Sequence, residues 1–182
     1  GFITSPTPKL LIVGAMPPAG DPGTDGLQHG AAIGILGIEF ETRRRNRMNG
    51  IIRQVANGQE VLVEVTQSFG NCAQYIQARR PHSIVAPFNA TLPSVTRRSA
   101  TLDDGDVALI SGADTFFIAS RSAMRSDARS EGLDVSHRGG RAGFVHVTGH
   151  RHLTFPDYRG NFFFNTLGNL QADPRCGLLF ID

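Results

Sequence analysis

Five consecutive residues, Ser136 to Gly140, combine the chemical groups that proteins use to hold a phosphate. Ser136 offers a hydroxyl, His137 an imidazole and Arg138 a guanidinium, whose charge-assisted hydrogen bonds to phosphate are among the stronger ones. Gly139 and Gly140 have no Cβ, so backbone N–H groups there approach an anion closely. The stretch therefore predicts a phosphate grip. The alternative is a strand that ends in a polar turn, with Arg138 solvated.

A second set of candidates follows three phenylalanines at residues 162–164. Their alternation gives a strand one apolar face, and Asn165, Thr166 and Asn169 then place small polar groups at the turn that follows. A flavin needs this combination of apolar wall and polar rim. The competing interpretation is a helix cap at Asn165 and Thr166 after an ordinary core strand.

Gln67 and Ser68 form a third, weaker set, since they follow one expected strand and precede an expected helix. A side-chain amide and a hydroxyl at such a junction reach a ligand readily, but many strand-to-helix turns have the same composition. We keep both residues as secondary candidates for the cofactor site.

An arginine-rich stretch, residues 42–50, places Arg43, Arg45 and Arg47 on one face of an expected strand. Nucleic-acid binding would use such a stripe for phosphate contacts, but the net charge is only +2 and the chain has 2 Tyr and no Trp for base stacking. An exposed strand edge protected by cations is the preferred interpretation, and we expect no nucleic-acid partner.

Recognised catalytic signatures are absent from the sequence: there is no GxSxG, no P-loop and no GxGxxG between a strand and a helix. His146, His150 and His152 share a short segment without a convincing carboxylate partner, and solvated loop histidines are commoner than metal ligands. We predict no metal site and assign no catalytic residue.

The composition, 40% hydrophobic and 19% charged over 182 residues, suits a globular protein with one large or two small domains. Lys9 is the single lysine, so the basic groups are almost all arginines, which suit carboxylate or phosphate ligands. The two cysteines have neither a zinc nor a disulfide-framework spacing. Without an apolar run of about 20 residues or a signal peptide, we predict no membrane partner and a cytoplasmic location.

Short apolar segments separated by Gly, Asn and Pro predict a mainly β chain with few helices. The first expected strands form a meander at residues 9–15, 31–40, 43–52 and 60–67. A helix over residues 71–80, capped by Asn71, comes next, and a second helix capped by Thr101 covers residues 102–113. The expected strands of the second half are residues 114–120, 133–138, 143–147, 152–155, 161–165 and 176–182. Such a pattern is typical of a closed or nearly closed barrel.

The two ends of the chain echo one another. Residues 1–3 match residues 143–145, and residues 34–39 match residues 177–182, with the offset changing by a single inserted residue. Chance similarity between apolar strands is the alternative, but we interpret the echo as an internal duplication. The sequence also begins in mid-pattern without Met, as a piece of a longer protein would.

Five blocks of the chain together resemble the pyridoxamine 5′-phosphate oxidase-like, FMN-binding split-barrel family, and most of all its longer, uncharacterised members with two such barrels. The blocks are residues 41–50, 67–77, 114–120, 134–147 and 153–182. The resemblance covers most of the chain except residues 81–99. It implies an internally duplicated, FMN-binding split β-barrel. The later strands and a helix of a first barrel unit would lie in residues 1–80. Residues 81–100 would connect it to a second unit, whose helix and early strands would lie in residues 101–182.

The resemblance also implies a cofactor and a set of residues that hold it. FMN would be bound through its phosphate at polar strand ends, usually across a dimer interface, in a homodimer or an intrachain pseudo-dimer. The strand at Arg138 supplies a phosphate-binding arginine in the family. The cofactor-binding residues implied here are Ser136, His137, Arg138, Gly139, Asn165, Thr166, Asn169, Gln67 and Ser68. One departure removes two cations: Asn169, Leu170 and Gln171 stand where the oxidases have Ser-Arg-Lys.

The function expected on these grounds is an FMN-dependent oxidoreductase with a small-molecule redox substrate, in which the flavin does the chemistry. Two alternatives remain open at this point. One is a cofactor-binding module without turnover, such as a flavin carrier or sensor. The other is a haem-handling split barrel, with His137 or the histidines at residues 146–152 as axial ligands.

Overall fold

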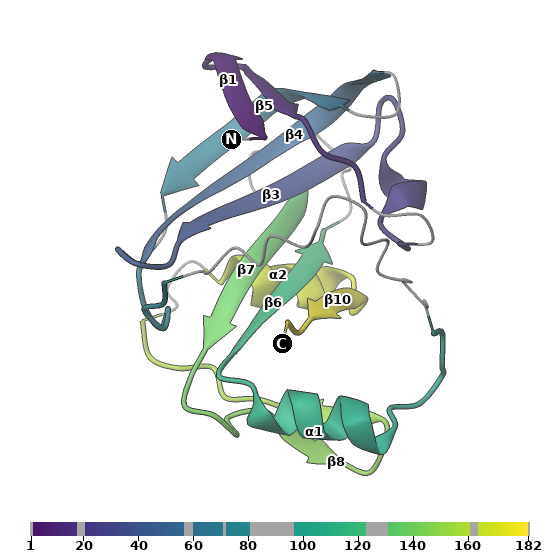
Figure 1. Cartoon of the computed structure of the whole chain (residues 1–182), viewed down its shortest axis with the longest axis vertical. Coiled ribbons are helices and arrows are strands. Elements are labelled where there is room, and N and C mark those ends of the chain that lie inside the picture. The colour runs from purple at the N-terminus through teal and green to yellow at the C-terminus, as the bar shows by residue number, and fades with distance from the viewer. Residues whose placement is uncertain are drawn as a thin grey trace, which may run out of the picture. The chain divides into compact units, whose positions relative to one another are not determined.

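The computed structural model of the chain describes residues 2–17, 21–56, 60–70, 72–80, 97–122, 131–160 and 164–181. Strands predominate, and two α-helices accompany them (Figure 1). The strands are β1 (Ile3–Thr7), β2 (Leu10–Val13), β3 (Ala32–Glu39), β4 (Arg44–Ala56), β5 (Glu60–Gly70), β6 (Thr115–Arg121), β7 (Leu133–Gly139), β8 (His146–Thr148), β9 (His152–Thr154) and β10 (Cys176–Leu179). The helices are η1 (Thr24–Gly26, a 3₁₀ turn), α1 (Asp104–Gly112) and α2 (Asn165–Ala172).

The strands form three sheets, in the orders β1-β2-β5-β4-β3, β10-β6-β7 and β8-β9. The registered pairs are antiparallel: Ile118 of β6, for example, lies opposite Ser136 of β7 and Leu178 of β10. The expected mainly β fold is confirmed. Within the described residues, none of the three sheets closes into a barrel, and no strand of residues 31–67 pairs with a strand of residues 114–182.

The chain divides into two compact units that are each built from separated stretches. Unit 1 comprises Gly1–Ile35, Met48–Phe69 and Arg80–Arg98, and unit 2 comprises Leu36–Arg47, Gly70–Arg79 and Ser99–Asp182. Two stretches that the sequence assigns to a first unit over residues 1–80 thus belong to unit 2.

Unit 1 has its own apolar core, made by Leu11, Ile52, Val61 and Val63. Val61 and Val63 are buried because alternate residues of β5 point to the same side of the sheet. Gly50 permits this packing: a Cβ there would collide with the Glu64 carbonyl and the Val63 side chain.

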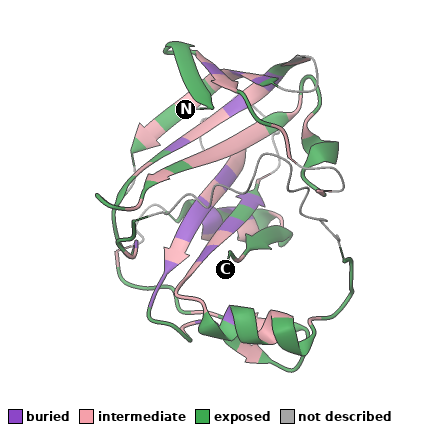
Figure 2. Ribbon diagram, in the orientation of Figure 1, coloured by how far each residue is buried: buried purple, intermediate pink, exposed green. Residues whose placement is uncertain are grey.

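Unit 2 is organised around Phe116, which is almost completely buried in β6. Its ring packs against three others, with centroid separations of 5.8 Å to Phe144, 4.9 Å to Phe155 and 5.2 Å to Phe180. Ile118 continues the buried face along β6, and buried positions are frequent in β6 and β7 (Figure 2). The rigid strand pair β6–β7 therefore provides the scaffold of this unit.

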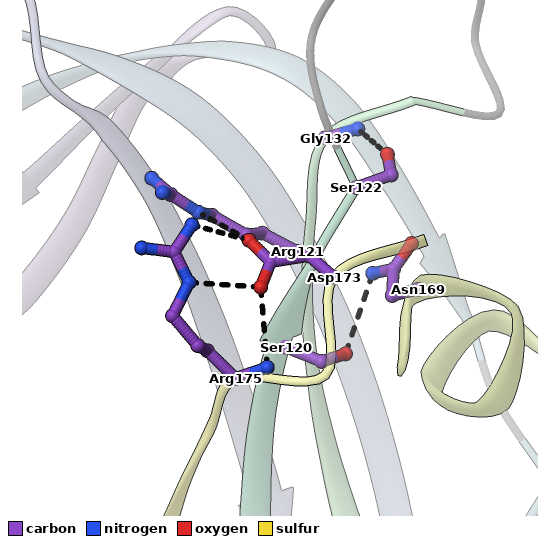
Figure 3. A network of polar contacts seen from close by, with 7 residues as sticks. All are labelled: Ser120, Arg121, Ser122, Gly132, Asn169, Asp173 and Arg175. Carbon is purple, nitrogen blue, oxygen red and sulfur yellow. Dashed lines mark hydrogen bonds and ion pairs between the residues drawn. The ribbon is translucent and has the colours of Figure 1, made fainter. Parts of the chain in front are cut away.

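Polar contacts connect α2 and β10 to the end of β6 (Figure 3). The buried Asn169 amide donates to the Ser120 hydroxyl at 3.3 Å. Asp173, just after α2, accepts hydrogen bonds from Arg175 at 2.8 and 2.6 Å and from Arg121 at 3.4 Å. The bonds from Arg175 are the main reason why the pKa of Asp173 is lowered.

Both helix predictions need correction. The helix expected over residues 102–113 exists as α1, but its N-cap is Asp103 instead of Thr101. The Asp103 carboxylate accepts from the Asp106 N–H at 2.8 Å and Asp106 reciprocates at 3.0 Å, a capping box that satisfies two backbone donors.

The helix expected over residues 71–80 is wrong: residues 72–80 form a turn and irregular backbone, and Asn71 lies outside the described residues. Hydrogen bonds to distant carbonyls hold this segment in its irregular conformation. The Gln77 amide donates to the Gly140 carbonyl at 2.9 Å and the Arg79 N–H to the Phe40 carbonyl at 3.4 Å. The expected strand at residues 161–165 also falls mainly outside the described residues, and Asn165 begins α2.

Candidate functional site

A partly enclosed pocket in unit 2 contains most of the predicted cofactor residues. Its lining comes from β4, β7, the start of α2 and three connecting segments. The lining residues are Arg45, Arg47, Cys72, Gln74, Tyr75, Ser136, His137, Arg138, Gly139, Phe144, Pro156, Tyr158, Gly160, Asn165 and Thr166. We call this the arginine pocket. Its volume is about 50 Å³, and since about 10–15 Å³ hold one water, a few waters or a tetrahedral anion fit.

Arg47 and Asp134 form the innermost charge pair of this region, with only 3% and 1% of their side chains exposed. The Asp134 carboxylate also accepts from the Thr166 hydroxyl at 2.6 Å and from the Ser136 hydroxyl at 3.2 Å. Asp134 thus neutralises Arg47 and positions two hydroxyls that line the pocket. Its ion pair with Arg47 and its two hydrogen bonds offset the cost of burying this carboxylate.

Arg45 lies two residues before Arg47 on β4 and shares its face. It is half-buried, and its terminal guanidinium nitrogen donates to the His137 carbonyl at a long 3.4 Å. Among the described residues, no carboxylate pairs with Arg45, and its Nε has no hydrogen-bond partner. Burial lowers the pKa of Arg45. A half-buried guanidinium without a carboxylate leaves positive charge available in the pocket.

Arg138 supplies a third cation to the pocket from the end of β7. Its guanidinium pairs with the partly exposed Asp157 carboxylate at 3.2 Å. That pair is close enough to the surface for solvent to weaken it. The predicted phosphate-binding arginine therefore lines the pocket, but it does so beside Arg45 and Arg47.

His137 is 4% exposed, and neither ring nitrogen has a hydrogen-bond partner among the described residues. Burial lowers its pKa to about 4, and the neighbouring Arg45 acts in the same direction. Arg79 and Arg138 add smaller effects of that sign, and Asp114 opposes them. At neutral pH the imidazole is uncharged, packed edge-on against Phe117 at 5.8 Å between ring centroids.

The two glycines of the predicted phosphate grip have a packing role. A Cβ on Gly139 would collide with the Tyr75 carbonyl, and one on Gly140 would lie 2.6 Å from the Phe144 ring. The Gly140 N–H is already bonded to the Asp114 carbonyl at 2.9 Å. The glycines let neighbouring segments approach β7, which is a different reason from the one that the sequence suggested.

The structure brings six predicted residues together in the arginine pocket: Ser136, His137, Arg138, Gly139, Asn165 and Thr166. Asn169 is instead buried beside Ser120, where it joins α2 to β6. Gln67 and Ser68 belong to β5 in unit 1, where the Gln67 side chain accepts from Asn49 at 3.1 Å.

Arg45 and Arg47 were interpreted from the sequence as part of a protected strand edge, and that interpretation is wrong. β4 lies between β5 and β3, and Arg47 is buried. An arginine spacing of two residues was the available signal, because it places two cations on one face of a strand. The spacing of the arginines does not indicate that a carboxylate from β7 pairs with one of them.

An open cleft of about 440 Å³ adjoins the pocket, with Tyr75, Phe144 and Tyr158 lining both. Gln77, Gly140, Arg141, Ala142 and Gly143 complete its lining. We call it the aromatic cleft. Its two tyrosine rings lie 5.2 Å apart at a tilt of 58° and are 41% and 38% exposed.

Comparison of the chain with protein-family models, curated proteins and solved structures gives no match. In the described part of the chain, no three His, Cys, Asp or Glu side chains are arranged to hold a metal ion, and His146, His150 and His152 are exposed. None of the helices within the described ranges has the length and apolar character needed to cross a bilayer. The candidate function is therefore inferred from the geometry of unit 2.

Proposed function

We propose that the chain binds FMN and that the arginine pocket receives the phosphate of this cofactor. The observation that carries the proposal is the convergence of Arg45, Arg47 and Arg138 on one small pocket together with the Ser136 hydroxyl. Guanidinium groups bind phosphate oxygens through paired, charge-assisted hydrogen bonds.

The charges around the pocket favour an anionic ligand. Asp134 offsets Arg47, and Asp157 at the surface pairs with Arg138. Arg45 has no such partner among the described residues, although burial disfavours its charge. A phosphate would supply the missing negative charge. The volume of the pocket suits a phosphate group and is too small for a flavin ring as well.

The pocket also contains arginines that bear on the cations missing from α2. Where the oxidases have Arg and Lys, this chain has Leu170, which packs in the core of unit 2, and the exposed Gln171. Arg45 and Arg47 of β4 bring two cations to the pocket from another part of the chain. We propose that they replace the lost pair.

We further propose that the fold is a duplicated split barrel. In its support, residues 34–39 lie in β3 and residues 177–179 in β10, and each strand is at the edge of its sheet. Residues 2–3 and 143–145 agree less well, since among these described residues only Ile3 is in a strand. With strands of the two halves in separate sheets, the idea that they complete one barrel has no support among the described residues.

FMN, when bound, would supply redox chemistry toward a small-molecule substrate. The residues described above would bind and orient the cofactor, and none of them is assigned a proton-transfer step. The proposed activity is accordingly an FMN-dependent oxidoreductase, with cofactor binding as the part that the pocket supports directly.

The test is titration of the purified protein with FMN and with riboflavin, which lacks the phosphate. Arg45→Gln and Arg138→Ala should each weaken FMN binding about tenfold or more, since a charge-assisted bond contributes roughly 1.5–3 kcal/mol. Riboflavin binding should change little. Arg44→Gln is the matched control, because Arg44 precedes Arg45 and is exposed. Equal losses for both ligands, or no FMN binding at all, would contradict the proposal.

A further inference from the structure

The aromatic cleft exposes two tyrosines that the fold could have covered. Tyr75 and Tyr158 rank among the large apolar side chains with substantial exposure, and they touch one another. Exposed aromatic groups gathered in one concave place mark binding sites more often than isolated ones do. At about 440 Å³, the cleft is within the range of small-molecule sites.

Hydrogen bonds hold the segments that line the cleft in place. The Tyr75 hydroxyl donates to the Arg159 carbonyl at 2.7 Å, which joins the two segments that carry the tyrosines. The Gln77 amide fixes the same segment to Gly140 at 2.9 Å. Gly160, whose φ is +111°, leaves room for the Gln74 side chain. A preformed aromatic surface of this kind costs a ligand little ordering on binding.

The position of the cleft relates it to the arginine pocket. Tyr75, Phe144 and Tyr158 line both spaces, so the pocket and the cleft are neighbours. The pocket is polar and small, whereas the cleft is larger and walled by rings. This pairing matches a ligand with a phosphate at one end and a planar ring system at the other.

We propose that the aromatic cleft binds the ring system of a phosphorylated planar ligand, with Tyr75 and Tyr158 as its stacking surface. The inference rests on the proposed function, because it assumes that the arginine pocket receives the phosphate. Stacking on an aromatic side chain depends on the π-face and tolerates different ring systems. The cleft thus selects ligands that have a planar ring system, and the arginines select ligands that carry a negative charge.

The chain offers a direct optical test. It has 2 Tyr and no Trp, and both tyrosines line the cleft, so its intrinsic tyrosine fluorescence comes from this place alone. Riboflavin and FMN should both change the tyrosine emission beyond the inner-filter correction measured with free tyrosine. Inorganic phosphate, which fills only the pocket, should leave the emission nearly unchanged while it competes with FMN.

Variants separate the two halves of the site. Tyr158→Leu should weaken riboflavin and FMN binding about fivefold or more, the lower end of what loss of one stacking partner causes, and leave inorganic phosphate binding unchanged. Tyr75→Phe keeps the ring and removes the hydroxyl, so it tests whether any loss reflects the bond to Arg159. Phe2→Leu, at an aromatic residue that is 62% exposed in unit 1, is the control.

The outcomes distinguish this inference from the proposed function. If FMN binds and depends on Arg45 but neither quenches tyrosine nor responds to Tyr158→Leu, the cleft proposal is wrong and the phosphate site stands. If FMN and inorganic phosphate both fail to bind, the proposed function fails and the cleft proposal fails with it.

Discussion

Arg47 of β4 and Asp134 of β7 form an ion pair that is buried at both ends, although 86 positions separate them in the chain. The Asp134 carboxylate also accepts hydrogen bonds from the hydroxyls of Ser136 and Thr166. Two charges removed from water in this way are costly unless each satisfies the other, so the pair fixes how β4, β7 and α2 meet. The geometry of the arginine pocket depends on it.

Asp134→Asn should lower the free energy of unfolding by about 3–5 kcal/mol, because it removes the charge of the carboxylate that pairs with the buried Arg47 guanidinium. Urea unfolding would measure the loss. Glu64→Gln, which breaks the exposed pair with Arg53, is the control and should cost less than about 1 kcal/mol. Similar small losses in both variants would show that the buried pair does not hold the unit together.

His137 should make stability depend on pH. Its pKa is about 4 in the folded protein against 6.5 for an ordinary histidine. As the pH falls from 6.5 toward 4, the unfolded chain gains a proton that the folded chain does not, so the free energy of unfolding falls. The loss reaches up to about 3 kcal/mol near pH 4. Below that pH both states carry the proton and the effect ends.

His137→Gln removes this titration while keeping a polar side chain. Urea unfolding of the two proteins at pH 7 and pH 4.5 should show a smaller loss on acidification for the variant. Carboxylates titrate in both proteins and cancel in the comparison. Parallel pH dependence in the two proteins would mean that His137 is not held neutral by its surroundings.

Gly139→Ala should destabilise unit 2 by about 1–3 kcal/mol, the usual cost of forcing extra atoms into a packed site. The added methyl would meet the Tyr75 carbonyl, so the segment that carries Tyr75 must shift. Gly37→Ala in β3 is the control, since a Cβ there meets nothing within 4 Å. Riboflavin binding should weaken only in the first variant, and equal effects would contradict the packing role of Gly139.

At the N-cap of α1, the structure and the sequence pattern favour different residues. Asp103→Ala removes the capping box and should cost about 0.5–2 kcal/mol in thermal or urea unfolding. Thr101→Ala, at the cap that the sequence alone favoured, should have little effect. The opposite ranking would place the N-cap of the helix two residues earlier than the structure does.

Local patterns in the sequence were sufficient for the elements whose stability is local. Short apolar segments between Gly, Asn and Pro predicted β5 and β6, and α1 lies within the helix predicted over residues 102–113. Residues 72–80 do not form the helix predicted over residues 71–80, because the Tyr75 and Gln77 side chains form hydrogen bonds to distant carbonyls that hold this segment in another conformation. Their partners are more than 60 positions away, and no window along the chain contains both ends of such a bond.

The residues of the candidate site show the same contrast between local patterns and distant contacts. Contiguous candidates such as Ser136 and Arg138 were found because they belong to one strand, and they share the pocket in the structure. Arg45 and the aromatic cleft were missed as parts of the site, since their role arises only when β4 and the segments around Tyr75 and Tyr158 meet β7. Asn169 was chosen for its type, yet burial beside Ser120 gives it a packing role.

The division of unit 2 among Leu36–Arg47, Gly70–Arg79 and Ser99–Asp182 bears on how this protein can have changed over time. Recombination that transferred only the last stretch would deliver Asp134 and Arg138 to a new host without Arg45 and Arg47. The carboxylate would then be buried without its ion-pair partner Arg47. Natural variants should therefore replace Arg47 and Asp134 together or keep both, so the two positions are expected to covary across lineages.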